Sequence, residues 1–237
     1  MRLDIALVQR NLYPTRAKAV AGIRAGLVLV NGKVAKKPGQ EIAGTDVLEA
    51  GKLPYVSGRG SLKLAHALDW FGLNPAGMVC LDVGASTGGF TEVLLNRGAA
   101  RVYAVDVGTN QLIPELRKNS CVVSLEQTDI RALPVQSVVD LIVIDVSFVS
   151  LTNIVGCLGA WGAKNIIALI KPQFEVSREV AAKYDGVIKS QQLHEESIAR
   201  VVEAFEKCGF LLCGVTESPI KGGSGNTEFL SCFQVKQ

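Results

Sequence analysis

The 237-residue sequence lacks the features that mark membrane, metal-binding and disulfide-bonded proteins. No apolar run reaches the roughly 20 residues that a membrane-spanning helix needs, and early charged residues leave no signal-peptide core. The six cysteines include no C-x-x-C pair, and only two histidines are present. These absences predict a cytoplasmic protein with reduced cysteines, no metal and no membrane partner.

The composition that remains is typical of a globular protein with a sizeable core, since 48% of the residues are hydrophobic and 20% are charged. The charge is unevenly distributed. Residues 1–53 carry nine Lys or Arg against four Asp or Glu, whereas residues 54–237 carry sixteen against eighteen. A small basic module in front of a near-neutral one indicates contact with a polyanion. A solvated basic face is the simpler alternative, and charge alone does not decide between them.

The basic module has its own pattern of helices and strands. Apolar spacing predicts a short helix near residues 3–8, and Pro14-Thr15 begins a second helix over residues 16–24. Residues 27–30 indicate a strand, and Asn31-Gly32 is a strong hairpin signal. Basic side chains gather on the second helix and around the hairpin: Arg16, Lys18, Arg24, Lys33, Lys36 and Lys37.

The motif T-R-A-K-A, followed by I-R-A-G-x-V-x-V-N-G-K-V, resembles the small RNA-binding domain first seen in ribosomal protein S-four. The resemblance implies a small α+β domain that holds structured RNA by its shape and backbone. The six basic residues would then contact phosphates, which supplies affinity but little sequence information. We therefore expect an RNA-binding domain over 1–53, a linker over 54–58 and a second domain over 59–237.

The second domain alternates strand and helix patterns, which is typical of a parallel sheet covered by helices on both faces. The near-continuous apolar strands predict an α/β, Rossmann-like fold. Strands are expected at 78–83, 101–105, 121–125, 139–144, 165–170, 210–215 and 228–235. Helices are expected at 62–70, 88–97, 111–118, 148–160 and 190–207.

The first of these strands runs into a glycine-rich loop, G-A-S-T-G-G, that opens a helix. Glycines let backbone N–H groups approach a ligand closely. A dinucleotide-binding loop needs G-x-G-x-x-G, and here Ser86 stands where pyrophosphate approach requires glycine. The loop therefore favours a ligand without phosphates, such as S-adenosylmethionine. A tight strand-to-helix connection is the simpler alternative.

Ionisable side chains follow the expected strands, at the edge where open α/β sheets bind ligands. Asp106 lies about twenty residues beyond the glycine loop, where an acid can accept hydrogen bonds from ribose hydroxyls. Lys171 ends an apolar run, and a partly desolvated lysine there can accept a proton from a ribose hydroxyl. Alternatively, each acid caps the helix that follows it, and Lys171 is a surface lysine without a catalytic role.

Residues 55–237 resemble the FtsJ-type ribose 2′-O-methyltransferases, whose signature is a Lys-Asp-Lys-Glu tetrad. The matching motifs are R-G-S-L-K-L, L-D-V-G-A-S-T-G-G-F-T, V-I-D-V-S-F, L-I-K-P-Q-F-E and K-G-G-S-G-N-T-E-F-L. They place the tetrad at Lys63, Asp145, Lys171 and Glu228. With the basic module in front, the whole chain resembles the TlyA family of rRNA 2′-O-methyltransferases, which also carries the older label hemolysin.

The resemblance implies an enzyme that methylates a ribose 2′-OH, on a cytidine, in ribosomal RNA or a ribosomal subunit. S-adenosylmethionine would be the cofactor, with Asp106 on its ribose and Asp129 on the adenine amino group. Lys171 would accept the hydroxyl proton, with the rest of the tetrad orienting the reacting groups. The residues expected to hold the cofactor are Asp82, Gly84, Ala85, Ser86, Thr87, Gly88, Phe90, Asp106 and Asp129.

Three other functions remain as alternatives. A pore-forming hemolysin would need an insertion segment, which the sequence does not show. The loop spacing disfavours an NAD-dependent oxidoreductase. A non-catalytic RNA-binding protein with a methyltransferase fold is disfavoured by the intact tetrad. The sequence indicates neither the oligomeric state nor the modified nucleotide and ribosomal subunit.

Overall fold

The computed structural model describes residues 1–13, 15–24, 26–51 and 58–236. The chain divides into two compact units, Met1–Val56 and Ser57–Gln237, and each is described by itself. The linker expected at 54–58 lies, except for Gly58, outside the described residues.

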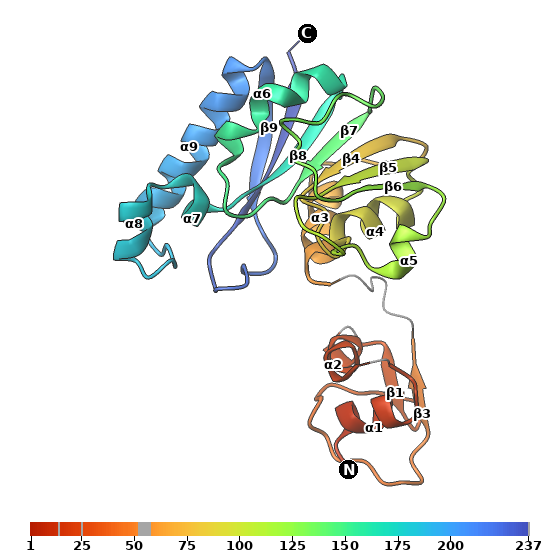
Figure 1. The fold of residues 1–237 in the computed structure, drawn as a ribbon. Helices are drawn as coiled ribbons and strands as arrows, with labels where there is room; N and C mark the ends of the chain where they lie inside the picture. Colours follow the sequence, from red (N-terminus) through yellow and green to blue (C-terminus); the bar gives the residue numbers. More distant parts are fainter. Residues whose placement is uncertain (14, 25, 52–57, 237) are drawn as a thin grey trace. The chain divides into compact units, whose positions relative to one another are not determined.

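The N-terminal unit consists of two helices and a three-stranded antiparallel sheet of order β2-β1-β3 (Figure 1). The elements are α1 (Leu3–Gln9), α2 (Arg16–Arg24), β1 (Val28–Val30), β2 (Lys33–Val34) and β3 (Leu48–Ala50). Both expected helices and the hairpin are confirmed. Asn31 and Gly32 have φ values of 51° and 74°, as a tight hairpin turn requires. Strand β3 was not expected, because three residues are too few for a periodic pattern.

The C-terminal unit contains a seven-stranded sheet of order β6-β5-β4-β7-β8-β10-β9. Its first five strands run parallel, whereas β10 is antiparallel to both β8 and β9. All seven expected strands form, with ends within two residues of the expected positions. They are β4 (Val79–Val83), β5 (Arg101–Val105), β6 (Val122–Leu125), β7 (Leu141–Ile144), β8 (Asn165–Ile170), β9 (Phe210–Glu217) and β10 (Phe229–Val235).

Helices cover both faces of this sheet (Figure 1). One face carries α3 (Gly60–Trp70), α4 (Gly89–Asn96) and α5 (Pro114–Arg117), and the other carries α6 (Val155–Leu158) and α9 (Gln191–Lys207). The core beneath α9 includes Phe205 stacked on Phe233, with ring centroids 4.1 Å apart. The central strands β4, β7 and β8 are buried on both faces, which explains why they could be predicted from their apolar composition.

The helices differ from expectation in three places. The expected helix 111–118 is shortened to α5, because three preceding backbone N–H groups donate to the carboxylate of Glu126. The expected helix 148–160 breaks into α6 between two 3-10 turns, η1 (Leu151–Asn153) and η2 (Gly159–Trp161), since its glycines disfavour a continuous helix. The short helices α7 (Pro172–Glu175) and α8 (Arg178–Lys183) were not expected.

Within the described ranges, no helix is long and apolar enough to cross a membrane. No group of three or more His, Cys, Asp or Glu side chains in that part of the chain is arranged to hold a metal ion.

Candidate active site

The glycine-rich loop connects β4 to α4, and its glycines are required by packing. A Cβ at Gly84, which has a φ of 84°, would lie 2.5 Å from the carbonyl oxygen of Asp145. A Cβ at Gly88 would lie 2.2 Å from the side chain of Leu116. Ser86 has a φ of 48°, a left-handed conformation that glycine adopts more easily. The loop therefore packs tightly against the end of β7. Ser86 adopts the left-handed conformation at the position where a dinucleotide-binding loop has its second glycine.

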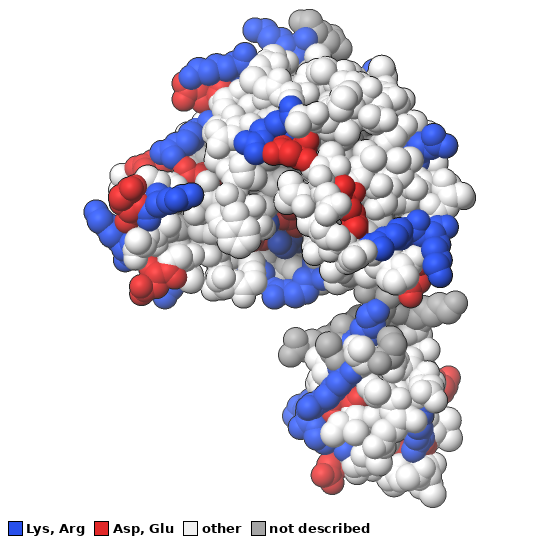
Figure 2. All heavy atoms as spheres, viewed as in Figure 1, with Lys and Arg blue, Asp and Glu red and all other residues white. Residues whose placement is uncertain are grey.

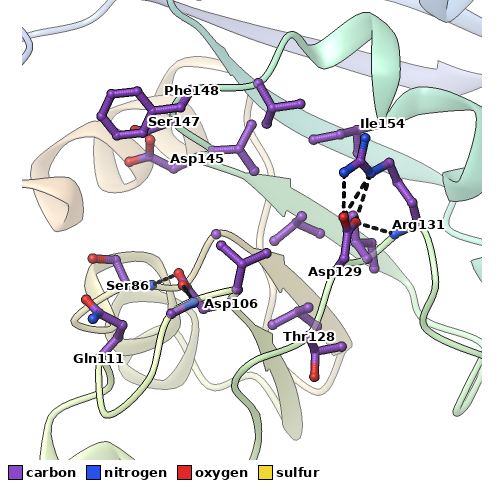
Figure 3. A pocket seen from close by; sticks show the side chains of 18 residues that line it. Ser86, Asp106, Gln111, Thr128, Asp129, Arg131, Asp145, Ser147, Phe148 and Ile154 are labelled. Carbon is purple, nitrogen blue, oxygen red and sulfur yellow. Dashed lines mark hydrogen bonds and ion pairs between the residues drawn. The ribbon is translucent and has the colours of Figure 1, made fainter.

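Two adjoining cavities lie beside this loop at the carboxyl ends of the parallel strands. Figure 3 shows the residues that line the larger one. The larger has a volume of about 580 Å³, within the range of small-molecule sites. The smaller has a volume of about 180 Å³ and reaches Lys171. Both are lined by Gly84, Ser86, Asp145 and Ser147. An elongated ligand that filled both would pass along the glycine loop toward Lys171.

Asp106 joins the end of β5 to the glycine loop. Its Oδ2 accepts a hydrogen bond from the backbone N–H of Ser86 at 2.8 Å, and its Oδ1 accepts one from Gly108 at 2.7 Å. The side chain lines the larger cavity. Each carboxylate oxygen has a further lone pair, so Asp106 can still accept hydrogen bonds from a ligand.

Asp129 also lines the larger cavity, but Arg131 binds its carboxylate (Figure 3). The guanidinium donates from Nε at 2.9 Å and from Nη2 at 2.5 Å, and these bonds hold the pKa of Asp129 below its usual value. The sequence interpretation did not single out Arg131. Opposite charges two residues apart in a loop are too common to mark a site.

Asp82 is fully buried and lines neither cavity. Its Oδ2 accepts a hydrogen bond from the Thr91 hydroxyl at 2.6 Å, whereas its Oδ1 has no partner among the described residues. Burial raises the pKa of Asp82 to about 7, and the negative charge of Asp145 adds to the shift. Asp82 therefore ties β4 to α4 beneath the loop.

Of the remaining residues predicted to hold the cofactor, some line a cavity and one does not. Ala85, Thr87 and Phe90 line the smaller cavity, whereas Gly88 lines neither. Gly88 instead begins α4 in a left-handed conformation, with a φ of 101°.

Lys171 and Asp145 form an ion pair at the smaller cavity, in which the lysine is buried and the aspartate is partly exposed. Lys171 follows β8 and is 8% exposed, and its Nζ lies 2.7 Å from Asp145 Oδ1. The same Nζ donates a hydrogen bond to Ser147 Oγ at 2.8 Å and lies 5.9 Å from the centroid of the Phe174 ring. Two acceptors therefore hold the ammonium in one orientation. Ser147 was not among the predicted site residues.

Lys63 and Glu228 form the other ion pair of the tetrad, and both of these residues are buried. Lys63 Nζ lies 2.6 Å from Glu228 Oε2, and their side chains are 10% and 3% exposed. A Cβ at Gly222 would lie 2.5 Å from Glu228 Oε1, so the loop before β10 packs directly on this carboxylate. Side chains on different segments thus stabilise each other's charge away from water.

Sheet register brings the two pairs to the same edge. Phe229 of β10 pairs with Ile170 of β8, so Glu228 and Lys171 end neighbouring antiparallel strands side by side. A Cβ at Gly60, where α3 begins, would lie 3.8 Å from Asp145 Oδ2. The structure therefore gathers the four tetrad residues from α3, β7, β8 and β10.

The predicted RNA-binding residues lie in the N-terminal unit, on whose surface Figure 2 shows several basic side chains. Lys33, Lys36 and Lys37 are exposed and form no ion pair with any residue that the structure describes. Lys18 is partly exposed, and the side chain of Arg24 lies outside the described part.

Arg16 is only partly available to a ligand. Its Nε donates to Asp4 Oδ2 at 2.8 Å, and Arg2 binds the same carboxylate. Asp4 is 1% exposed, and the hydrogen bonds from Arg2 and Arg16 hold its pKa well below the usual range. Arg16 therefore stabilises a buried acid, although its side chain remains 60% exposed.

The glycine loop, the strand order and the edge cavities define a Rossmann-like methyltransferase unit. Residues 55–235 match the family model for FtsJ-like methyltransferase, and residues 1–48 match the S4 domain, the ribosomal-protein-S-four-like module. The chain therefore belongs to the FtsJ-like methyltransferase family.

Similar proteins narrow this assignment. The chain is 42% identical to the 16S/23S rRNA (cytidine-2′-O)-methyltransferase TlyA of Mycobacterium tuberculosis, over 96% of this chain and 87% of that protein. It is 39% identical to Hemolysin A of Brachyspira hyodysenteriae, over 98% and 99%. A solved Streptococcus thermophilus structure labelled as a hemolysin has 40% identity and a TM-score of 0.74, covering 100% of this chain and 89% of that one. The predicted resemblance to the TlyA family is confirmed.

Proposed function

We propose that this protein transfers the methyl group of S-adenosylmethionine to a ribose 2′-OH in ribosomal RNA. The observation that carries the proposal is the Lys171–Asp145 pair, which faces a cavity that continues along the glycine loop. The name of the Mycobacterium tuberculosis relative supports the same reaction and supports a cytidine as the modified nucleoside.

The cavity residues fit S-adenosylmethionine better than a phosphate-bearing cofactor. The backbone N–H of Ser86 already donates to Asp106, so this amide is not directed at a phosphate. Asp106 would accept from the ribose hydroxyls, and Asp129, shared with Arg131, would accept from the adenine amino group. Gly84 to Thr87 would hold the methionine portion beside the smaller cavity. The bound cofactor supplies an electrophilic methyl group on a positively charged sulfur.

Nζ of Lys171, once the ammonium of the ion pair has released one proton, would accept the proton of the attacking 2′-OH. The cofactor would supply the methyl group to the ribose oxygen and would keep the electron pair of the broken sulfur–carbon bond on sulfur. Asp145 and Ser147 keep Nζ directed at the cavity, and Asp145 stabilises the positive charge that Lys171 gains. Lys63 and Glu228 line neither cavity and would act by fixing the start of β10 beside Lys171. Alignment of the reacting atoms contributes more than covalent chemistry in such a site.

The target nucleoside would enter beside Phe148. This side chain is 91% exposed, has a φ of 65° and lines the larger cavity, with its ring centroid 5.2 Å from that of Phe174. An exposed aromatic face at a nucleic-acid site can stack on an unpaired base. The S4 domain would supply phosphate contacts through its exposed lysines.

The test is to incubate the protein with radiolabelled S-adenosylmethionine and unmodified 30S or 50S subunits and then to map the label. We expect 2′-O-methylation of a cytidine. Absence of label from both subunits and from free rRNA would overturn the proposal. A parallel liposome-leakage assay tests the hemolysin name carried by the Brachyspira relative.

A further inference from the structure

Glu175 is a buried carboxylate outside the tetrad. It lies at the end of α7, is 4% exposed and lines neither cavity. Its Oε2 accepts a hydrogen bond from Ser150 Oγ at 2.5 Å, and its Oε1 accepts one from the backbone N–H of Leu151 at 3.0 Å. Arg200 of α9 donates to its backbone carbonyl. Both carboxylate oxygens and the main chain are therefore engaged.

These bonds join the two segments that carry the Lys171–Asp145 pair. Asp145, Ser147 and Phe148 lie on the loop that ends at Ser150. Lys171 immediately precedes α7, whose single turn ends at Glu175, and the Phe174 N–H donates to the Lys171 carbonyl at 2.8 Å. The loop is thus attached to the Lys171 turn at its start by the ion pair and at its end by Glu175.

The middle of the same loop is held in an uncommon conformation. Phe148 has a φ of 65°, which a bulky residue adopts only where its surroundings impose it. Its ring contacts Phe174, which lies on α7 next to Glu175. If the bonds from Glu175 were lost, the end of the loop would be free to relax, and Ser147 and Phe148 would move with it.

Burying this carboxylate has a cost, since desolvation raises the pKa of Glu175. A buried polar group that is retained at such a cost, without touching the cavity, is explained when it specifies one arrangement of its neighbours. The two donors that it accepts from lie 24 and 25 residues away in sequence, so this contact joins the end of the loop to the Lys171 segment, in addition to the β7–β8 pairing and the ion pair.

We propose that Glu175 is a positioning residue for methyl transfer, which sets the spacing between the 145–150 loop and Lys171. The inference rests on the proposed function. Glu175 touches no reacting atom and acts through Ser150 and Leu151 on the orientation of Asp145, Ser147 and Phe148. Misplacement of reacting groups by about 1 Å can cost on the order of 100-fold in rate.

The experiment compares full-length wild type with Glu175→Gln, using unmodified subunits and labelled S-adenosylmethionine. The amide oxygen still accepts from Leu151, whereas the amide nitrogen can only donate toward Ser150, so the hydrogen bond from Ser150 to a carboxylate oxygen is lost. We expect kcat to fall about 10- to 100-fold, with the KM for S-adenosylmethionine unchanged. The midpoint of the pH profile of kcat should also shift, because the acceptors around Lys171 move. The matched control is Glu206→Gln on the exposed face of α9, which should behave as wild type.

Ser150→Ala removes the partner from the other side and serves if Glu175→Gln does not fold. It should lower kcat in the same way, and the double variant should be no worse than the more impaired single variant. A wild-type kcat and pH profile in folded Glu175→Gln or Ser150→Ala, with only a lower melting temperature, would overturn the positioning role. If wild type itself transfers no methyl group, the proposed function fails instead.

Discussion

The two units of this protein place their lysines differently. In the N-terminal unit, Lys33, Lys36 and Lys37 are exposed and pair with no described residue. In the methyltransferase unit, Lys63 and Lys171 are each 8% exposed and lie within 2.7 Å of a carboxylate oxygen. An exposed ammonium adapts to many phosphate positions, whereas a buried and paired one is held in a single orientation. Under the proposed function, burial and pairing, more than charge, would separate the lysines that bind RNA phosphates from those that take part in methyl transfer.

A buried acid in each unit differs in the direction of its pKa shift. Asp4 and Asp82 are 1% and 0% exposed. Two arginines bind Asp4 and lower its pKa, whereas Asp82 has a hydroxyl partner and a pKa raised to about 7. Two acids of similarly low exposure therefore show opposite pKa shifts, because Asp4 has two cations beside it, whereas desolvation is the largest effect on Asp82.

The largest expected effect tests the buried lysine that faces the cavity. Lys171→Ala should abolish methyl transfer, a loss of at least about 1,000-fold, because the proton acceptor is removed. Binding of S-adenosylmethionine, measured by calorimetry, should remain nearly intact. Lys164→Ala, at an exposed position just before β8, is the control. Full activity in Lys171→Ala would remove the assigned role.

The second prediction concerns the cost of an unpaired buried charge. Glu228→Gln leaves Lys63 buried without its carboxylate and should lower the free energy of unfolding by about 3–5 kcal/mol. Chemical denaturation measures this loss. Adding Lys63→Met should restore much of the stability without restoring activity.

The matched control for that experiment is Glu203→Gln, in the exposed Glu203–Lys207 pair of α9. This pair should show no measurable change, because solvent screens it. Equal losses at the buried and the exposed pair would contradict the comparison.

The third prediction uses pH to separate Asp82 from Asp4. The folded-state pKa of Asp82 lies above its ordinary value of 3.8, at about 7, so the unfolded state releases this proton first. Its contribution to stability should fall as pH rises from about 4 to 7, by roughly 3–4 kcal/mol at most. Asp82→Asn should remove this fall in denaturant titrations at several pH values.

Asp4 should show the opposite sign. Its pKa is lowered in the folded state, so its stabilising contribution is present above the unfolded pKa and is lost as the pH falls through the folded one. Asp4→Asn should therefore flatten the acid limb of the stability curve. If both variants changed the free energy of unfolding over the same pH range, the contrast between Asp4 and Asp82 would be wrong.

The smallest expected effect tests the exposed lysines. Changing Lys33, Lys36 and Lys37 to Gln should weaken binding to rRNA and reduce the slope of log affinity against log salt by up to about 3. Filter binding between low and moderate salt measures the slope. The same three positions changed to Arg should retain it, and an unchanged slope in the Gln variant would remove these lysines from the interface.

Much of the fold was predictable because its signals are local. Near-continuous apolar runs predicted all seven strands of the large sheet, and Asn31-Gly32 predicted the hairpin. The family motifs indicated the four tetrad positions. Strand β3 and helices α7 and α8 were missed because three to six residues carry too little periodicity.

The contacts of Ser147 with Lys171 and of Glu175 with Ser150 were not predictable from local patterns. Ser147 lies 24 residues from Lys171 in sequence, and Glu175 lies 25 residues from Ser150. Such contacts follow from strand order and register, and neither is written in the periodicity of a single segment.

The sequence by itself determined which local features are present. These are the apolar strands, the glycine loop, the acids near strand ends and the basic N-terminal segment. Tertiary structure decided what each charge does. Asp82 and Asp106 follow the same strand-end pattern, yet one is sealed beneath α4 and the other lines the cavity. The antiparallel register of β10 on β8 placed Glu228 beside Lys171. The physical reason is that desolvation and charge pairing depend on neighbours distant in the chain, which only the packed sheet brings together.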